Sequence, residues 1–200
     1  MTKETDLASL AAELEALTGS PLYAYRVENH YQVVAGEGNP DADILFIGEA
    51  PGASEAKSGR PFVGASGRVL AELLASIGLS RDDVYITNVV KDRPPENRDP
   101  SAAEIALYAP FLQRQIAIIQ PNVIATLGRF AMDFVLQLFD APQQGQKIGD
   151  LHGQPIPLQA PYGPITLVPL YHPAVALYNR DQRGTLEQDF KELEAVSRKA

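Results

Sequence analysis

The chain has 200 residues, of which 45% are hydrophobic and 21% charged, and its formal net charge is −8 at pH 7. A chain of this length buries about 70% of its unfolded surface, so we expect a single domain over residues 1–200. The absence of cysteine excludes disulfides, thiol nucleophiles and cysteine-bound zinc or iron–sulfur centres. No apolar run approaches 18 residues and the N-terminus is acidic, which predicts a cytoplasmic protein with no membrane partner.

The first half of the chain predicts two helices and one buried strand. Leucines at helical spacing predict an N-terminal helix at about 6–18. The apolar run over 44–47 ends at Gly48 and is typical of a strand buried on both faces. A long loop follows, and then apolar residues at helical spacing predict a helix over 66–77.

The same alternation continues to the end of the chain. Capping boxes at Ser101–Glu104 and Thr185–Gln188 indicate where two later helices begin. The remaining predicted elements are strands over 84–90, 123–127 and 165–169, helices over 102–119, 129–138 and from 185 onward, and an extended connection with a minor strand over 140–163. Four strands alternating with helices predict an α/β fold: a three-layer α/β/α sandwich around a central, mainly parallel four-stranded sheet.

Ligands of such sheets bind beyond the carboxyl ends of the strands. The loops over 48–68, 91–100, 129 and 180–183 are predicted to lie at this edge, and they hold nine basic and six acidic residues. The rest of the chain is strongly acidic, so the predicted ligand edge is positive on an acidic body. This distribution favours a polyanion held weakly and steered by charge, whereas an ordinary mixed surface is the alternative interpretation.

Three side chains at this edge could carry chemistry. Phe62 is a lone aromatic in a glycine-rich loop, and is either a loop anchor or a stacking face for a planar ligand. Asn88 interrupts an apolar strand, where a buried amide needs hydrogen-bond partners. His172 follows the last predicted strand and reaches the same edge, as a loop anchor or a functional imidazole. The three histidines show no metal-ligand spacing, so we expect no metal site.

Several motifs occur in order between residues 33 and 190. They are Gly36–Pro40, Gly48–Gly52, Gly59–Gly64, Thr87–Lys91 with Arg93–Pro100, and Tyr171–Ala174. Each motif is weak alone, but the ordered set resembles the uracil-DNA glycosylase superfamily. It is most similar to family 4, a group that usually carries an iron–sulfur cluster.

The resemblance implies a role for each candidate. Phe62 would stack on a flipped-out uracil, and Asn88 would read its O4 and N3–H edge. His172 would donate to uracil O2 as negative charge builds on the base. These two and Glu49, a candidate for placing the catalytic water, form the expected catalytic set. The base would also touch the backbone around Gly48, Glu49 and Ala50, where the best-known family of the superfamily has an aspartate in place of Ala50.

The resemblance also implies contacts to uracil-containing DNA, the expected partner of a monomeric enzyme. The segment of Val175, Ala176 and Leu177 would wedge into the duplex where the base left the stack. The basic residues expected to contact phosphates are Lys91, Arg93 and Arg98.

This chain departs from family 4 at the four positions that would supply cysteines to the cluster. Two lie in the region of Pro21 to Ala24, one falls at Asp92, and Tyr108 is the expected counterpart of the fourth. A thiolate-bound cluster is chemically impossible without cysteine, so we expect no cofactor. We also expect four tyrosines to fill the vacated volume: Tyr23, Tyr25, Tyr31 and Tyr108.

The expected function is therefore hydrolysis of the N-glycosidic bond of uracil in DNA, the first step of base excision repair. Three alternatives remain open from the sequence. The chain could act on another deaminated base, it could bind damaged DNA with little turnover, or it could be an α/β phosphate- or nucleotide-binding module with no DNA role. Release of uracil and hypoxanthine from single- and double-stranded oligonucleotides separates them.

Overall fold

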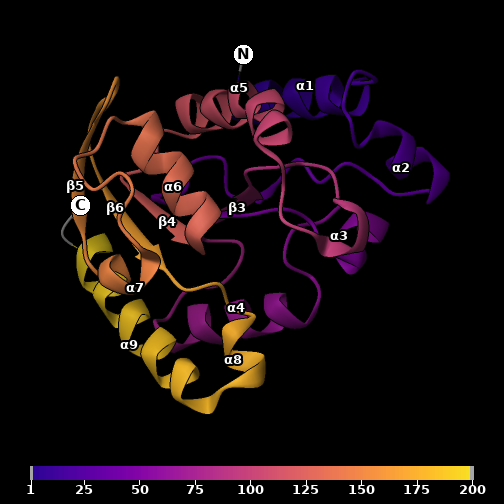
Figure 1. The fold of residues 1–200 in the computed structure, drawn as a ribbon. Helices are drawn as coiled ribbons and strands as arrows, with labels where there is room; N and C mark the ends of the chain where they lie inside the picture. Colours follow the sequence, from indigo (N-terminus) through magenta and orange to yellow (C-terminus); the bar gives the residue numbers. More distant parts are fainter. Residues whose placement is uncertain (1, 199–200) are drawn as a thin grey trace.

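The computed structural model describes residues 2–198, and its centre is one six-stranded sheet (Figure 1). The strands are β1 (Glu37–Gly38), β2 (Ile44–Gly48), β3 (Tyr85–Asn88), β4 (Val123–Leu127), β5 (Ile156–Ala160) and β6 (Gly163–Leu170). They lie in the order β1-β3-β2-β4-β6-β5. Strands β3, β2, β4 and β6 run parallel, whereas β1 and β5 pair antiparallel at the two edges.

The four predicted strands form the parallel centre of the sheet, but the sheet is not four-stranded. The edge strand β5 lies within the connection for which we expected a minor strand. Strand β1 was missed because it has only two residues, and Gly36 just before it and Gly38 within it have positive φ angles of 132° and 128°. A strand this short has no period from which it could be predicted.

Helices cover both faces of the sheet, which confirms the three-layer arrangement (Figure 1). The helices are α1 (Lys3–Glu15), α2 (Tyr23–Glu28), α3 (Ala53–Ser58), α4 (Ala65–Ser76), α5 (Ala102–Ile119), α6 (Arg129–Leu138), α7 (Ile148–Leu151), α8 (Val175–Tyr178) and α9 (Arg180–Ser197), with a 3₁₀ turn over Pro95–Asn97. Helices α1, α5 and α6 pack on one face, and α4 and α9 pack on the other.

Two predicted helix boundaries were wrong. Helix α1 begins at Lys3 rather than near residue 6, because Thr2 accepts a hydrogen bond from the Thr5 N–H and forms a capping box. Helix α9 begins at Arg180, where the Asn179 side chain accepts from the Asp181 N–H. The capping box expected at Thr185 is therefore inside the helix. The capping box at Ser101 does begin α5, as predicted.

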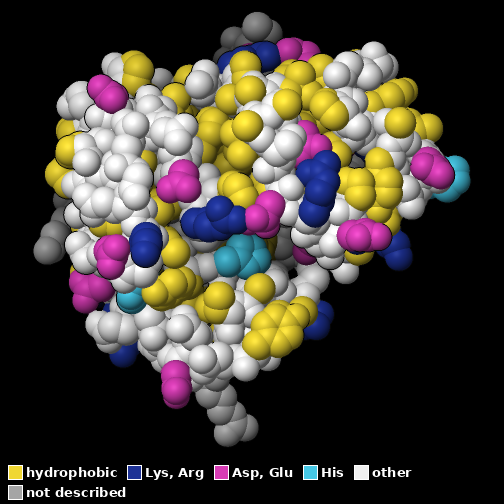
Figure 2. Space-filling model, viewed as in Figure 1, with side chains coloured by type: hydrophobic (Ala, Val, Ile, Leu, Met, Phe, Trp, Pro, Cys, Tyr) yellow, Lys and Arg dark blue, Asp and Glu magenta, His cyan; other side chains and the backbone are white. Residues whose placement is uncertain are grey.

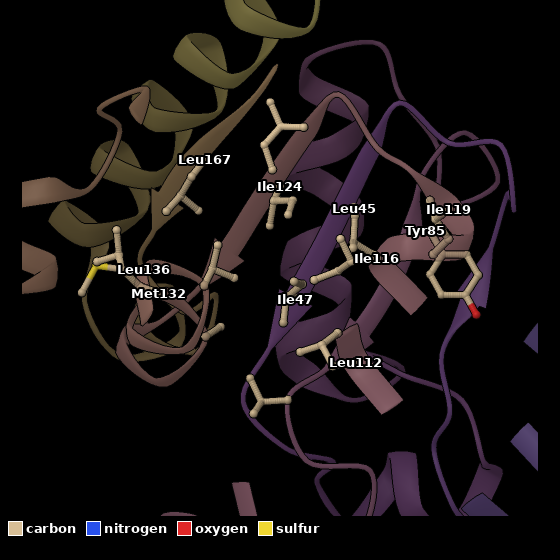
Figure 3. Packing of buried hydrophobic residues seen from close by; sticks show 14 of the residues in the cluster. Leu45, Ile47, Tyr85, Leu112, Ile116, Ile119, Ile124, Met132, Leu136 and Leu167 are labelled. Carbon is tan, nitrogen blue, oxygen red and sulfur yellow. The ribbon is translucent and has the colours of Figure 1, made fainter. Parts of the chain in front are cut away.

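Two hydrophobic clusters, one on each face, hold the layers together. Figure 3 shows side chains from the strands meeting side chains from α5 and α6. Those labelled on the strands are Leu45, Ile47, Tyr85, Ile124 and Leu167, and those on the helices are Leu112, Ile116, Ile119, Met132 and Leu136. Burial of apolar surface on both faces fixes the register of the strands and so the positions of the residues at their carboxyl ends. In the described part of the chain, no helix has the length and apolar character needed to span a membrane.

Candidate active site

A cavity of about 480 Å³ opens at the carboxyl edge of the sheet, where the topology places a ligand site. Strand β2 ends at Gly48 and β3 ends at Asn88, and these two residues are register partners in the sheet. His172 follows β6 by two residues. The lining includes Glu49, Ala50, Phe62, Asn88, His172 and Leu177. The structure therefore brings together these six nominated residues from segments far apart in the chain. Of the other nominated residues, the cavity lining includes Arg98 but not Gly48, Lys91, Arg93, Val175 or Ala176.

Gly48 leaves room for two side chains that line this cavity, Asn88 and Phe62. A Cβ atom at this position would clash with the Asn88 Oδ1 atom and would lie 2.6 Å from the Phe62 Cζ atom. Contacts under 3.0 Å displace the neighbouring group or the backbone. Glycine is thus required for the Phe62 ring and the Asn88 amide to sit together against the end of β2.

Asn88 carries an unpaired polar atom. Its side chain is 2% exposed, and its Oδ1 atom is buried without a hydrogen-bond partner in the described residues. Buried polar atoms in folded proteins are nearly always paired, because an unpaired acceptor costs about 1–3 kcal/mol. An orphaned acceptor that borders a cavity indicates a site that receives its donor from a ligand.

His172 is held as a neutral donor. The Ala174 N–H donates to His172 Nδ1 at 3.2 Å, which places the imidazole proton on Nε2. Burial lowers the pKa of His172 to about 4, partly opposed by the negative charge of Glu55. At neutral pH the ring therefore presents one N–H donor at Nε2. Its centroid lies 5.8 Å from that of Phe62, with the two rings tilted by 33°.

Phe62 is a loop anchor that also lines the cavity, and its stacking on a planar ligand stays a prediction. Its ring is 7% exposed and belongs to the core cluster beneath α4, and it also lines the cavity. Its backbone is left-handed, with φ at 50°. The next two peptide groups are held by Glu55, whose Oε1 atom accepts from the Val63 N–H at 2.9 Å and from the Gly64 N–H at 2.8 Å.

Glu55 is a residue whose role sequence reasoning missed. The sequence indicated no role for this carboxylate. The two N–H groups that it binds lie eight and nine residues further along the chain. The irregular loop between them has no residue periodicity from which these contacts could be predicted.

Glu49 lies half-buried at the mouth of the cavity, directly after β2. Its pKa is raised chiefly by burial and further by the charge of Asp99, whereas Arg129 opposes the shift. Arg129 in turn forms an ion pair with Asp99 at 2.5 Å. A half-buried carboxylate with a raised pKa beside a polar cavity is suited to hold a water molecule and accept a proton from it.

The sequence matches the family model described as "Uracil DNA glycosylase superfamily" over residues 35–195. The chain belongs to this superfamily. It is 47% identical to the Type-4 uracil-DNA glycosylase of Archaeoglobus fulgidus over 160 residues, which is 80% of this chain and 79% of the relative. It is 41% identical to the Type-4 uracil-DNA glycosylase of Thermotoga maritima over 181 residues, or 90% and 87% of the two chains. The Type-5 uracil-DNA glycosylase of Thermus thermophilus is 36% identical over 132 residues, covering 58% of this chain and 60% of the relative.

Ion pairs neutralise part of the basic edge predicted for this superfamily member. On the face in Figure 2, Lys and Arg side chains lie among acidic ones and do not gather into one patch. The pairs in the predicted loops are Arg60–Glu37, Arg98–Glu104, Arg129–Asp99 and Arg183–Glu72. On this face, the described basic side chains therefore do not form a continuous cationic surface.

The position of Lys91 contradicts its predicted contact with a DNA phosphate. The side chain is fully buried, and its Nζ atom donates to Thr87 Oγ1 at 2.6 Å and to Gln115 Oε1 at 2.5 Å. Burial lowers its pKa well below the ordinary lysine value. Lys91 holds β3 against α5 and cannot reach DNA. A lysine in a loop gives no sign of this burial, because Gln115 lies 24 residues further along the chain.

The two arginines of the same loop differ in accessibility. Arg98 lines the cavity and is exposed, although Glu104 accepts from its guanidinium at 2.6 and 2.9 Å. Arg93 is half-buried, and donates to Asn97 Oδ1 at 2.8 Å and to the Tyr31 hydroxyl at 2.6 Å. Arg98 remains the better placed of the two to meet a phosphate at the mouth of the cavity.

The three residues of the expected wedge segment differ in exposure. Val175 and Ala176 are half-buried and pack against the core cluster under α4 and α9, and their use as a wedge stays a prediction. Leu177 is 42% exposed and lines the cavity. The next residue, Tyr178, is 88% exposed on the same rim. The predicted wedge segment ends at Leu177 and does not include Tyr178.

The region where the family resemblance implies an iron–sulfur cluster is filled by hydrogen-bonded side chains. The Tyr108 hydroxyl donates to Asp92 Oδ2 at 2.6 Å and lies 2.7 Å from Ser20 Oγ. Arg26 Nη1 lies 3.2 Å from Asp92 Oδ1, and Arg26 Nη2 donates to the Glu15 carbonyl at 3.0 Å. This polar network joins the end of α1, α2, the loop after β3 and α5.

The residues present do not fit a cluster. No thiolate is available in a chain without cysteine, and Asp92 and Tyr108 are already paired to each other. Of the four tyrosines expected to fill the volume, Tyr108 is buried and bonded within the network, whereas Tyr23, Tyr25 and Tyr31 are only half-buried. The prediction missed Arg26 as the main partner. Within residues 2–198, no three His, Cys, Asp or Glu side chains gather in a way that could hold a metal ion.

Proposed function

We propose that this chain is a uracil-DNA glycosylase, which hydrolyses the N-glycosidic bond of a uracil flipped out of DNA and so starts base excision repair. The observation that carries the proposal is the unpaired Oδ1 atom of Asn88, buried in one cavity with the Phe62 ring and the neutral His172 donor. The activity named for the relatives is in accord with it.

Asn88 supplies the reading of the base. Its Oδ1 atom accepts from uracil N3–H, and its amide N–H donates to O4, while the Phe62 ring stacks on the base. Cytosine has an acceptor at N3 and an amino group at C4, which is the opposite pattern. A bound cytosine would therefore leave Asn88 Oδ1 unpaired. Rejection by an unpaired buried polar atom is a strong form of discrimination.

Bond cleavage depends on stabilising the leaving base. As the bond between N1 and the sugar C1′ breaks, its electron pair leaves with uracil, and His172 Nε2–H donates to the developing charge on O2. A water molecule held by Glu49 adds through its oxygen to C1′ and gives a proton to the carboxylate. Because Ala50 supplies no carboxylate of its own, the anion-stabilising contact of His172 carries the larger share of catalysis.

The DNA would be held at the rim of the cavity. We assign phosphate contact to Arg98, with Arg93 in support through the loop that it shares, and we assign the wedge to Leu177 beside the exposed Tyr178. We propose that the acting unit is a monomer.

The test measures uracil release from single- and double-stranded oligonucleotides, with Asn88→Ala and Asn88→Asp beside the wild type. We expect wild-type release of uracil, and a loss of about 2 kcal/mol in transition-state stabilisation for Asn88→Ala. Asn88→Asp should gain activity on cytosine relative to uracil, because a carboxylate accepts from the cytosine amino group. Wild-type rates for Asn88→Ala would show that the base is read elsewhere.

The same assay separates the other functions. Release of hypoxanthine in preference to uracil would identify an enzyme for another deaminated base. Binding of uracil-containing DNA without release would identify a damage-binding protein. A chain that neither binds nor cleaves such DNA would contradict the proposal entirely.

The pH profile tests the role of Glu49. Its carboxylate must be ionised to accept a proton, and its pKa is raised by burial. The single-turnover rate should therefore fall as the pH is lowered through a value above the ordinary one for glutamate, before His172 titrates at about 4. Glu49→Gln should remove this acidic limb and slow the reaction at neutral pH by no more than about 10²-fold. An unchanged acidic limb in Glu49→Gln would assign the titration to another group.

A further inference from the structure

Arg81 binds the backbone of the loop that carries Phe62. Its Nη1 atom donates to the Phe62 carbonyl at 2.8 Å, and its Nη2 atom donates to the Pro61 carbonyl at 2.6 Å. Nη2 also forms an ion pair with Glu37 of β1 at 2.7 Å. Arg81 lies between α4 and β3, outside the lining of the cavity. It therefore acts on the site only through the loop that it holds.

The Phe62 backbone needs such a partner. A phenylalanine with φ at 50° is in a conformation that side chains with a Cβ rarely adopt. Such a conformation persists only where the surroundings determine it. Here Arg81 fixes the two carbonyls at Pro61 and Phe62, and Glu55 fixes the next two N–H groups. Four successive polar groups of the loop are thus held from two sides.

The position of the ring follows from this backbone. The Phe62 ring meets the Cα side of Gly48 and lies beside Asn88 and His172. On its other side the Phe62 carbonyl contacts α4 at Gly67, where an added Cβ would clash with that oxygen. Because Phe62 is closely packed on both sides, a change in its backbone must shift the ring relative to Asn88 and His172.

We propose that Arg81 is a positioning residue that sets the stacking face of the pocket by holding the Pro61 and Phe62 carbonyls. This inference rests on the proposed function, in which Phe62 stacks on the flipped base. The bidentate geometry requires a guanidinium, because its two nitrogens reach two carbonyls and the Glu37 carboxylate together. Small displacements of a positioning group cost up to about 10²-fold in rate.

The experiment measures single-turnover uracil release, with enzyme in excess, for Arg81→Met, Arg81→Lys and Arg60→Met. Arg60 is the matched control, because it pairs with the same Glu37 carboxylate but touches neither loop carbonyl. We expect a loss of about 10-fold or more for Arg81→Met, partial recovery for Arg81→Lys, and the wild-type rate for Arg60→Met. Melting temperatures are measured for all variants, and rates are compared well below the lowest of them.

A double-mutant cycle with Phe62→Leu distinguishes positioning from general stabilisation. If Arg81 acts through the ring, Arg81→Met should add little to the loss that Phe62→Leu already causes. Independent, additive losses would overturn the proposal, as would a wild-type rate for Arg81→Met. Should Arg81→Met fail to fold, Arg81→Lys in the same cycle gives the same two outcomes. An absence of uracil release by the wild type would instead contradict the proposed function, so the two failures are distinguishable.

Discussion

Replacing His172 with alanine should slow single-turnover release of uracil by about 10²- to 10³-fold, the scale for loss of one anion-stabilising donor. The Nε2–H donor faces charge that exists only as the bond breaks, so its contribution is larger in the transition state than in the ground state. Affinity for uracil-containing DNA should change much less. The measurement pairs single-turnover cleavage with equilibrium binding for the wild type and His172→Ala.

His172→Gln is the informative companion variant, because an amide offers an N–H donor without an imidazole. It should recover part of the rate. Equal losses of binding and cleavage in His172→Ala would make His172 a structural residue. The protonated form is not needed, since the pKa of His172 is about 4. Activity should therefore persist throughout the neutral range, and a requirement for protonation near pH 6.5 would contradict the neutral-donor assignment.

The sequence predicted the parts of the fold that depend on local periodicity. Strands β2 and β4 are short apolar runs between turn residues, and the Ser101–Glu104 capping box marks the start of α5. Helices α2 and α3 were missed because each has six residues, too few to show a period. The Thr185–Gln188 pattern resembled a helix start, but the Asn179 side chain caps the helix six residues earlier.

The pocket was predictable because its residues end strands or follow them. Asn88 and His172 were nominated by strand order, and parallel strands place their carboxyl ends at one edge. The roles of Lys91, Glu55 and Arg81 could not be predicted from the sequence. Their hydrogen-bond partners lie in other loops or helices, and no spacing rule connects them to those partners. Charge counted along the sequence also failed as a guide to the surface, because ion pairs such as Arg98–Glu104 form only in the fold.

The hydrogen-bond partners in the polar network at Asp92 also could not be predicted from the sequence. Among the interactions discussed, we expect loss of this network to have the largest effect on stability. The family resemblance implied lost cysteines at positions 92 and 108, but it could not identify Arg26 and Ser20 as the partners of Asp92 and Tyr108. Asp92 is 1% exposed, and burial raises the pKa of its carboxyl while Tyr108 and Arg26 oppose that shift. The network joins helices at the N-terminal end of the chain to the loop that carries Arg93 and Arg98.

Asp92→Ala should therefore lower the free energy of unfolding by about 3–5 kcal/mol, because it leaves the buried Arg26 charge without its partner. The measurement is urea denaturation, with midpoints compared at equal slopes. Glu13→Ala is the control: it removes a carboxylate that pairs with Arg114 at the surface, and such exposed pairs contribute little.

The double variant Arg26→Met with Asp92→Leu separates two contributions to the free energy of unfolding. One is the penalty of leaving the Arg26 charge unpaired, and the other is the stabilisation provided by the ion pair. Replacing both ions with apolar side chains removes the desolvation penalty together with the attraction, so the double variant should be more stable than Asp92→Ala alone. If Asp92→Ala unfolds at the same urea concentration as the wild type, the network does not hold α1 and α2 to the loop. If the double variant is the less stable of the two, the pair itself stabilises this region, and the penalty of the unpaired Arg26 is not the cause of the loss.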